Sequence, residues 1–274
     1  MLFCRPEMID FRSLSDLLSQ VITLTPAEFE GVYQGLRRSF DRLSDSPFRD
    51  DFVRKPVTLV SSTLVHSASL EHPGIDVPCW IEIAPSGHRI IVLGQDPLRD
   101  DRYFSIEDKS TVVIGTPYSA HSACLRERGN SARYWKIMRH LLGAGYNLYL
   151  TDVSKFWARD HKVPPSAKQT YRTILQGELD LLAPSGSAAF VVAFGTRASA
   201  FLLGPAFPVT AKIATAKAKI FTAGPVNVLP VLHPSPQNEG VLKGYLRAND
   251  VDPAQGVVGI AEVITRTIER FMHR

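Results

Sequence analysis

The chain is poor in cysteine, and this restricts its chemistry. Its 274 residues include 3 cysteines, and these (Cys4, Cys79 and Cys124) lie far apart. Scattered thiols of odd number indicate neither a disulfide framework nor a zinc site, and they cannot supply the four thiolates of an ordinary iron–sulfur cluster. We therefore expect chemistry that uses no metal and no other cofactor.

Long apolar runs are also missing. Stretches such as residues 188–194 end after a few residues, well short of the roughly 20 that a membrane helix needs. The first twenty residues carry scattered charges in place of the basic head, apolar run and cleavage site of a secretory signal. We expect a cytoplasmic protein that does not enter a membrane.

A strong charge of one sign is absent as well. The chain has 31 Lys and Arg against 27 Asp and Glu, a formal net charge of +4. Such an excess suits a polyanionic partner but is common among small-molecule enzymes, so charge alone identifies no partner. With 45% hydrophobic and 21% charged residues, the composition is that of an ordinary globular protein.

Apolar spacing predicts a helical N-terminal part. Leucine, valine and aromatic residues recur there at intervals of three and four; they are Leu14, Leu17, Leu18, Val21, Phe29, Val32, Tyr33 and Leu36. Thr25 followed by Pro26 and Glu28 is typical of a capped helix start. We expect residues 1–50 to form an N-terminal helical extension and residues 51–274 to form one α/β domain.

From residue 57 onward, short β-branched runs alternate with helical patterns. The predicted strands are residues 57–65, 77–84, 89–93, 147–150, 188–194, 219–222 and 227–232. The predicted helices are residues 131–142, 169–182, 196–203 and 253–272. This alternation favours an α/β fold with a mostly parallel sheet.

Chemically useful residues follow several of the predicted strands. Asp96 and His233 each come directly before a proline after an apolar strand, Asp152 follows another strand, and Gly195 follows a fourth. Ligands of open α/β sheets bind outside the carboxyl ends of the strands, so these residues should converge on one edge.

Each of these residues also has a plain structural interpretation. Asp96 alone could be a turn aspartate that bonds its own backbone, and a lone histidine such as His233 is more often structural than catalytic. Taken together they suggest more, because Pro234 and Pro236 make the loop stiff enough to aim an imidazole. A carboxylate and an aimed imidazole suit cleavage of a bond with a charged leaving group.

Two segments resemble the signature motifs of the uracil-DNA glycosylase superfamily. The first is Gly94-Gln95-Asp96-Pro97 after an apolar strand, and the second is His233-Pro234-Ser235-Pro236 after another. The segment 149–155, with Pro164 and Pro165 downstream, is similar to the base-recognition strand of some branches. The resemblance covers roughly residues 89–246, and residues 1–80 match nothing comparable.

The resemblance implies a fold and an activity. The fold would be a three-layer α/β/α sandwich with a central, mostly parallel, four-stranded sheet. The activity would be that of a metal-independent, monofunctional DNA glycosylase in base excision repair, which hydrolyses the N-glycosidic bond of uracil or a related deaminated base flipped out of DNA. The expected partner is DNA that contains a damaged base, the expected cofactor is none, and we expect a monomer.

The resemblance also implies roles for individual residues. Asp96 would place negative charge near the sugar and orient the attacking water, and His233 would donate to the departing base as a neutral imidazole. The implied base-binding residues are Gln95, Tyr118, Asp152 and Thr151, and the implied DNA-binding residues are Pro97, Ser235, Pro236, Gly195 and Lys155. Tyr118 would stack on the base, although an aromatic residue after a proline is more often simple packing. Further cations expected near the same strand ends are Arg159, Lys162, Lys243 and Arg247.

The chain departs from the superfamily pattern at several positions, so the resemblance does not identify the base that would be excised. Leu98 and Arg99 stand where the best-known branch has a tyrosine and a histidine. Asp152 stands in place of an asparagine that reads uracil; an ionised carboxylate only accepts hydrogen bonds, whereas a protonated one also donates and could suit a cytosine-like edge. The leucine that wedges into the helix is also missing, and Val241 or Leu242 could substitute.

Two other functions remain open from the sequence. The chain could be a superfamily relative that binds nucleic acid or a protein without efficient catalysis, which the missing asparagine and wedge would allow. It could also be a different α/β hydrolase or nucleotide-binding enzyme whose short motifs match by chance.

Overall fold

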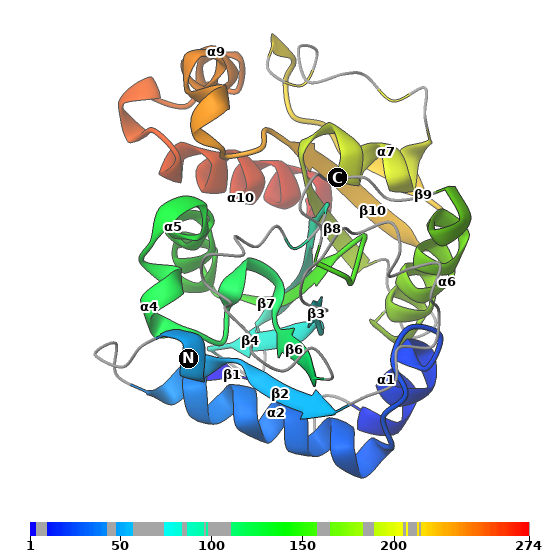
Figure 1. Cartoon of the computed structure of the whole chain (residues 1–274). Helices are drawn as coiled ribbons and strands as arrows, with labels where there is room; N and C mark the ends of the chain where they lie inside the picture. Colours follow the sequence, from blue (N-terminus) through cyan, green and yellow to red (C-terminus); the bar gives the residue numbers. More distant parts are fainter. Residues whose placement is uncertain are drawn as a thin grey trace.

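A computed structural model of the chain describes residues 1–3, 10–42, 48–56, 74–83, 87–95, 97, 111–157, 165–182, 189–204, 207, 213 and 215–273. In these residues the fold is a mixed α/β arrangement built on two sheets (Figure 1). No helix among them combines the length and the apolar character required to cross a membrane. The strand expected at 57–65 lies outside the described residues.

The larger sheet has seven strands within the described residues, in the order β1-β4-β7-β5-β8-β10-β9. They are β1 (Leu2–Phe3), β4 (Cys79–Glu82), β5 (His88–Gly94), β7 (Tyr146–Asp152), β8 (Ala189–Phe194), β9 (Phe221–Ala223) and β10 (Val226–Val231). The four central strands β7, β5, β8 and β10 are parallel, whereas β4, β1 and β9 are added antiparallel at the two edges.

The expected α/β class is therefore confirmed, but the expected sheet of four strands is too small. Strands β7 and β10 are buried along their whole length, as parallel strands are when helices cover both faces. The sequence showed these strands as apolar runs. The edge strands β4 and β9 overlap the strands expected at 77–84 and 219–222, whereas β1 was not expected.

The smaller sheet has the order β2-β6-β3 and was not expected. Its strands are β2 (Val53–Pro56), β3 (Gly74–Asp76) and β6 (Thr111–Gly115). Strand β6 leads directly into a short helical turn, η4 (Pro117–Ser119). The smaller sheet thus helps to set the position of Tyr118.

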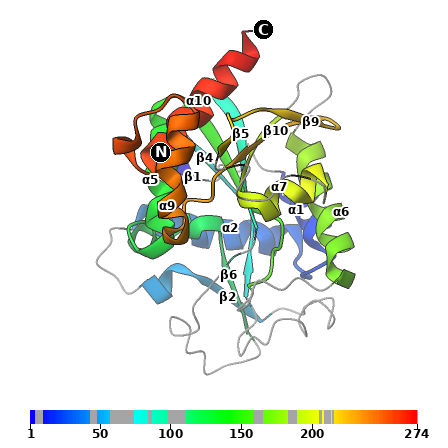
Figure 2. The ribbon, with the colours of Figure 1, turned by 90° about the horizontal axis from the view of Figure 1, so that it is seen from above.

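Helices cover both faces of the larger sheet. The longer ones are α1 (Phe11–Leu18), α2 (Pro26–Asp41), α5 (Gly129–Gly143), α6 (Pro165–Leu182), α7 (Gly195–Leu203), α9 (Glu239–Ala248) and α10 (Val258–Met272). Shorter helical segments are η2 (Phe48–Asp51), α4 (Ala123–Arg126), η5 (Pro236–Asn238) and η6 (Pro253–Gln255). Seen from above, α5, α9 and α10 lie on one side of the sheet and α1, α6 and α7 on the other (Figure 2).

The N-terminal helices form as their sequence predicts. Thr25 and Glu28 make a complete capping box at the start of α2, with Pro26 at its first position. The buried faces of α1 and α2 belong to the same hydrophobic core as the sheet, the Tyr33 hydroxyl donates to the Pro78 carbonyl (2.5 Å), and Phe3 stacks on Phe40. Helices α1 and α2, with Phe3, therefore pack into the main core. The expected domain boundary after residue 50 stays a prediction.

Candidate functional site

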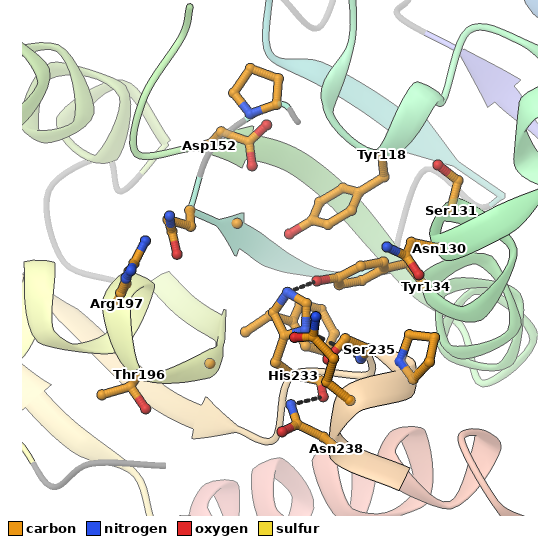
Figure 3. A pocket seen from close by; sticks show the side chains of 17 residues that line it. Tyr118, Asn130, Ser131, Tyr134, Asp152, Thr196, Arg197, His233, Ser235 and Asn238 are labelled. Carbon is orange, nitrogen blue, oxygen red and sulfur yellow. Dashed lines mark hydrogen bonds between the residues drawn. The ribbon is translucent and has the colours of Figure 1, made fainter. Parts of the chain in front are cut away.

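A cavity of about 760 Å³ opens at the carboxyl ends of β5, β7, β8 and β10 (Figure 3). Its lining consists of Gly94, Gln95, Pro97, Tyr118, Asn130, Ser131, Tyr134, Asp152, Phe194, Gly195, Thr196, Arg197, His233, Ser235, Pro236, Gln237 and Asn238. This is the edge at which ligands of open α/β sheets bind, and the volume is that of an ordinary ligand pocket.

The floor of the cavity is formed where β5 and β7 end side by side. Gly94 is paired in register with Asp152, and the Val153 amide donates to the Gly94 carbonyl (3.0 Å). A Cβ atom at Gly94 would lie 2.1 Å from Asp152 Oδ1 and 2.8 Å from Tyr118 Oη. Glycine is required here because the carboxyl and hydroxyl groups occupy the space that a side chain would fill.

Tyr118 is held in a conformation that tyrosine rarely adopts. Its backbone is left-handed (φ 56°), as is that of Ser119 (φ 54°), which costs on the order of 1–3 kcal/mol for each residue. Trp135 Nε1 donates to the Tyr118 carbonyl (2.9 Å) and holds the turn in place. Burial, reinforced by the charge of Asp152, keeps the Tyr118 pKa well above 10, so the hydroxyl keeps its proton.

His233 is oriented by hydrogen bonds at both ring nitrogens. Nδ1 accepts the backbone N–H of Ser235 (3.2 Å), which requires an unprotonated Nδ1 and selects the neutral Nε2–H form. Nε2 lies 2.5 Å from the Tyr134 hydroxyl, so the ring donates to Tyr134 Oη. The site therefore presents a neutral imidazole donor at the cavity.

The loop that carries His233 is fastened to helix α5 and to itself. Arg133 Nε donates to the Pro234 carbonyl (2.5 Å), and the same guanidinium pairs with Glu239. The Asn238 amide donates to the His233 carbonyl (2.8 Å). With two prolines in the loop, these contacts fix the imidazole in one position.

Gly195 allows helix α7 to begin beside this loop. Its φ is +80°, and a Cβ atom there would lie 3.2 Å from the Cβ of His233. A larger residue would be strained by its backbone and crowded by the loop. Helix α7 can therefore present Thr196 and Arg197 at the cavity edge.

Aromatic rings form one wall of the cavity. The Tyr134 ring lies 4.6 Å from that of Tyr118, 5.1 Å from Phe194 and 5.4 Å from the His233 imidazole, measured between centroids. The last two contacts are edge-to-face, which aromatic pairs favour. This wall suits a flat ligand more than a flexible polar one.

Most of the site residues predicted from the sequence line this cavity. They are Gln95, Pro97, Tyr118, Asp152, Gly195, His233, Ser235 and Pro236. Asp96 lies outside the described residues, as do Arg159 and Lys162, but Gln95 and Pro97 on either side of Asp96 both line the cavity. Two distant motifs thus meet at one place.

Two of the predicted site residues are placed differently. Lys155 was expected to contact DNA, but its side chain is 1% exposed and its ammonium lies 2.8 Å from Glu178 Oε1 inside the protein. Thr151 was expected to read a base, but its hydroxyl donates to Glu178 (2.8 Å) on the face away from the cavity. Leu242, one candidate for a wedge, is also buried, whereas Val241 is exposed.

Sequence reasoning missed the contribution of helix α5. Tyr134 and Arg133, which contact the His233 loop, belong to a predicted amphipathic helix with no motif around them. Only the three-dimensional arrangement shows that consecutive residues of this helix reach one loop about a hundred positions later. Lys243 and Arg247 are exposed but do not line the cavity.

The described residues contain no group of three His, Cys, Asp or Glu side chains that could hold a metal ion. Cys79 and Cys124 are buried free thiols. In comparisons with known proteins, no protein-family model matches the chain and no curated protein matches it either. What the site does is therefore inferred from its geometry.

Proposed function

We propose that the protein is a DNA glycosylase that hydrolyses the N-glycosidic bond of uracil or a related deaminated base flipped out of DNA. The observation that supports this most is that Gln95, Pro97, Asp152 and His233, drawn from three strand ends, line a single cavity. We also propose that β7, β5, β8 and β10 correspond to the central sheet of the three-layer sandwich of the uracil-DNA glycosylase superfamily, with the edge strands as additions.

The proposed reaction needs two opposite charges to be stabilised at once. As the bond between C1′ and the base nitrogen breaks, its electron pair leaves with the base and the sugar becomes oxocarbenium-like. Asp96 would stabilise the sugar cation and accept a proton from the water whose oxygen bonds to C1′. In this proposed reaction, side chains alone stabilise both charges, and no metal is required.

His233 would stabilise the departing base. Its neutral Nε2–H form is a hydrogen-bond donor that becomes stronger as negative charge develops on a base oxygen. Tyr134 Oη accepts this hydrogen bond in the structure, so a base oxygen would replace or join that hydroxyl. The released base anion then takes a proton from solvent.

The cavity edge suits a phosphate backbone. Ser235 and Pro236 belong to the loop fastened by Arg133, and the exposed Arg197 stands at the start of α7. Flipping a base costs a few kcal/mol, so contacts to the flanking phosphates must offset it. DNA is the proposed partner, and the chain is proposed to act as a monomer.

One observation favours a second candidate, a superfamily relative that binds nucleic acid without efficient catalysis. His233 Nε2 is already engaged by Tyr134 at 2.5 Å, so the imidazole reaches a base only if that contact is rearranged. A binder would tolerate this arrangement, whereas a fast catalyst must change it in every turnover.

The decisive experiment is base release from end-labelled oligonucleotides that carry uracil, hypoxanthine or xanthine, with alkali used to cut abasic sites. We expect product from the native chain, and Asp96→Asn and His233→Ala should each lower the single-turnover rate about 10²- to 10⁴-fold. The matched controls are Asp250→Asn and His88→Ala, which alter an exposed carboxylate and an exposed imidazole outside the cavity.

Each outcome discriminates between the candidates. Retained binding of the oligonucleotides without abasic product supports the binding module. Neither binding nor product removes both candidates. Equal rates for the native chain and both site variants would show that the two motifs take no part in the reaction.

A further inference from the structure

Two oxygen atoms of opposite hydrogen-bonding character lie together at the cavity floor. A Cβ atom at Gly94 would lie 2.1 Å from Asp152 Oδ1 and 2.8 Å from Tyr118 Oη. Since both oxygens lie so near the same position, they are close to each other. Both side chains line the cavity and point into it (Figure 3). Within the described residues, the buried Tyr118 hydroxyl has no hydrogen-bond partner.

An unpartnered buried hydroxyl needs an explanation. Leaving it unsatisfied is unfavourable because the hydroxyl loses its hydrogen bonds to water, and the left-handed backbone at Tyr118 adds strain. Packing against Tyr134 and Phe194 would be served equally well by phenylalanine, which has no hydroxyl to desolvate. The hydroxyl is therefore explained best by a ligand that occupies the cavity.

We propose that the Tyr118 hydroxyl and the Asp152 carboxylate together read one edge of a nucleobase, with the hydroxyl donating to a carbonyl oxygen and the carboxylate accepting from the adjacent ring N–H. This inference rests on the proposed function. The pair supplies one donor and one acceptor side by side, which are the two groups that a single asparagine amide would offer. Tyr118 supplies the donor that an ionised aspartate lacks.

This pairing defines a substrate class. A ring N–H next to a carbonyl is a lactam edge, and hydrolytic deamination creates it by turning an amino group beside an unprotonated ring nitrogen into a carbonyl beside a ring N–H. Uracil and hypoxanthine have this edge where cytosine and adenine do not. In the parent bases the ring nitrogen lone pair would face the carboxylate with no hydrogen between them, so they are rejected.

A protonated Asp152 is the competing arrangement. It would donate and accept by itself, and the Tyr118 hydroxyl would then be dispensable. The raised pKa of Tyr118, which follows from its burial beside Asp152, keeps the phenol available as a donor but does not decide between the two arrangements. A double-mutant cycle does.

The cycle compares the native chain, Tyr118→Phe, Asp152→Asn and the double variant on a uracil oligonucleotide under single-turnover conditions. Tyr118→Phe should lower the rate about 10- to 100-fold in the native background. In the Asp152→Asn background the same change should cost less than about threefold, because the new amide donates to the carbonyl. Tyr171→Phe, a buried tyrosine outside the cavity, is the matched control and should keep the native rate.

Equal losses in both backgrounds, or no loss in either, would overturn the inference, since the hydroxyl would then act only by packing or not at all. Base selectivity gives a second readout. The native chain should release uracil and hypoxanthine but neither cytosine nor adenine, and Tyr118→Phe should narrow that difference. Melting temperatures of all variants within a few degrees of the native chain exclude misfolding as the cause.

A binding measurement with free nucleobases distinguishes failure of the proposed glycosylase activity from failure of this inference. Saturation-transfer NMR with free uracil and free cytosine requires no bond cleavage. Uracil contact that depends on the Tyr118 hydroxyl, in a chain that releases no base from DNA, would retain the reading pair and remove the glycosylase. Base release together with equal effects of Tyr118→Phe in both backgrounds would support the glycosylase and reject the pairing of Tyr118 with Asp152. No contact with either base and no base release would reject both proposals.

Discussion

Thr151 and Asp152 are consecutive residues at the end of one strand, yet their side chains serve two different environments. Strand side chains alternate between faces. Thr151 therefore points toward α6 and a closed polar cluster, while Asp152 points into the cavity. Both are almost fully buried, so burial alone does not separate a structural residue from one that meets a ligand.

The closed cluster consists of Thr151, Lys155 and Glu178, which bond to one another inside the protein. The Lys155 ammonium donates to Thr151 Oγ1 (2.5 Å), to the Asp152 carbonyl (2.8 Å) and to Glu178 Oε2 (3.0 Å). These three contacts use all three of its hydrogens. Such a cluster holds the end of β7 in place, and none of its three residues lines the cavity.

The open side differs in what it leaves unsatisfied. Tyr118 brings a hydroxyl without a partner among the described residues, and the rings of Tyr118, Tyr134 and Phe194 line the cavity. The contrast shows that an unpartnered group that lines a cavity indicates a ligand site better than charge alone does, because the charged pair Lys155–Glu178 lies on the closed side.

The largest effect that tests this contrast is the loss of the buried cation. Lys155→Met leaves Glu178 buried without its counter-ion and should lower the free energy of unfolding by about 3–5 kcal/mol. Urea denaturation measures this. Asp152→Asn, one residue from the cluster but on the open face, should change it by less than about 1 kcal/mol. A Lys155→Met variant as stable as the native chain would show that the pair contributes nothing to folding.

A second double variant separates charge from packing on the closed side. Lys155→Met combined with Glu178→Leu removes both charges and should recover much of the lost stability, because buried ion pairs are often replaced by apolar groups at little cost. No recovery would mean that the hydrogen bonds to Thr151 and the Asp152 carbonyl, rather than the ion pair, hold the strand end.

Much of the large sheet could be predicted from the sequence because its central strands are continuous apolar runs. β5, β7, β8 and β10 all fall within a few residues of the expected strands. The small sheet could not be predicted, since β2 and β3 are short and polar and acquire their pairing only through β6. Helix α9 was also missed, because glycine and charged residues interrupt its pattern.

The candidate site was predictable where motifs with fixed backbone geometry carry it. Gln95, Pro97, His233 and Ser235 each stand in a glycine- or proline-containing turn after a strand, and they meet as the sheet topology requires. Thr151 was misplaced because a one-residue difference along a strand reverses the face, and Lys155 was misplaced because its side chain turns inward to the buried Glu178. Tyr134 was missed because nothing local distinguishes it from a core residue of α5.

Gly94→Ala tests the close approach at the cavity floor. The added methyl group would lie 2.1 Å from Asp152 Oδ1 and 2.8 Å from Tyr118 Oη, so both side chains must move. We expect a stability loss of about 1–3 kcal/mol together with loss of uracil contact in saturation-transfer NMR. Gly143→Ala, at a helix end with open space around it, is the control and should leave both measurements unchanged. Native uracil contact in Gly94→Ala would show that the two oxygens do not read the base.

Tyr134→Phe examines the contact between the aromatic wall and His233. Removing the hydroxyl takes away the Tyr134 contact of Nε2 and with it a hydrogen bond that helps to orient the ring. We expect about a 10-fold lower single-turnover rate, equivalent to about 1.4 kcal/mol. A rate increase would mean instead that Tyr134 restrains the imidazole, as the binding-module candidate requires. Single-turnover assays with uracil oligonucleotides decide between these results.

The smallest effect compares two buried tyrosines. Tyr171, on α6, has hydrogen bonds with Ser154 and the Phe156 backbone, and burial raises its pKa to about 12. Between pH 10 and 12 the unfolded chain, whose tyrosines ionise near about 10, releases a proton that the folded chain keeps. Stability is then full below pH 10 and falls by about 1.4 kcal/mol per pH unit above it.

Tyr171→Phe should therefore remove about one released proton from the dependence of the free energy of unfolding on pH above pH 10. It should also lower the free energy of unfolding at pH 8 by about 1 kcal/mol, because its hydrogen bonds are lost. Tyr118→Phe should reduce the slope similarly, because its pKa is raised as well. At pH 8 it should raise the free energy of unfolding slightly, since it removes a buried hydroxyl that has no partner within the described residues. Urea denaturation at pH 8, 10 and 11 measures both. Equal losses at pH 8 would mean that the Tyr118 hydroxyl makes a hydrogen bond within the protein, and the contrast between the two sides of β7 would then fail.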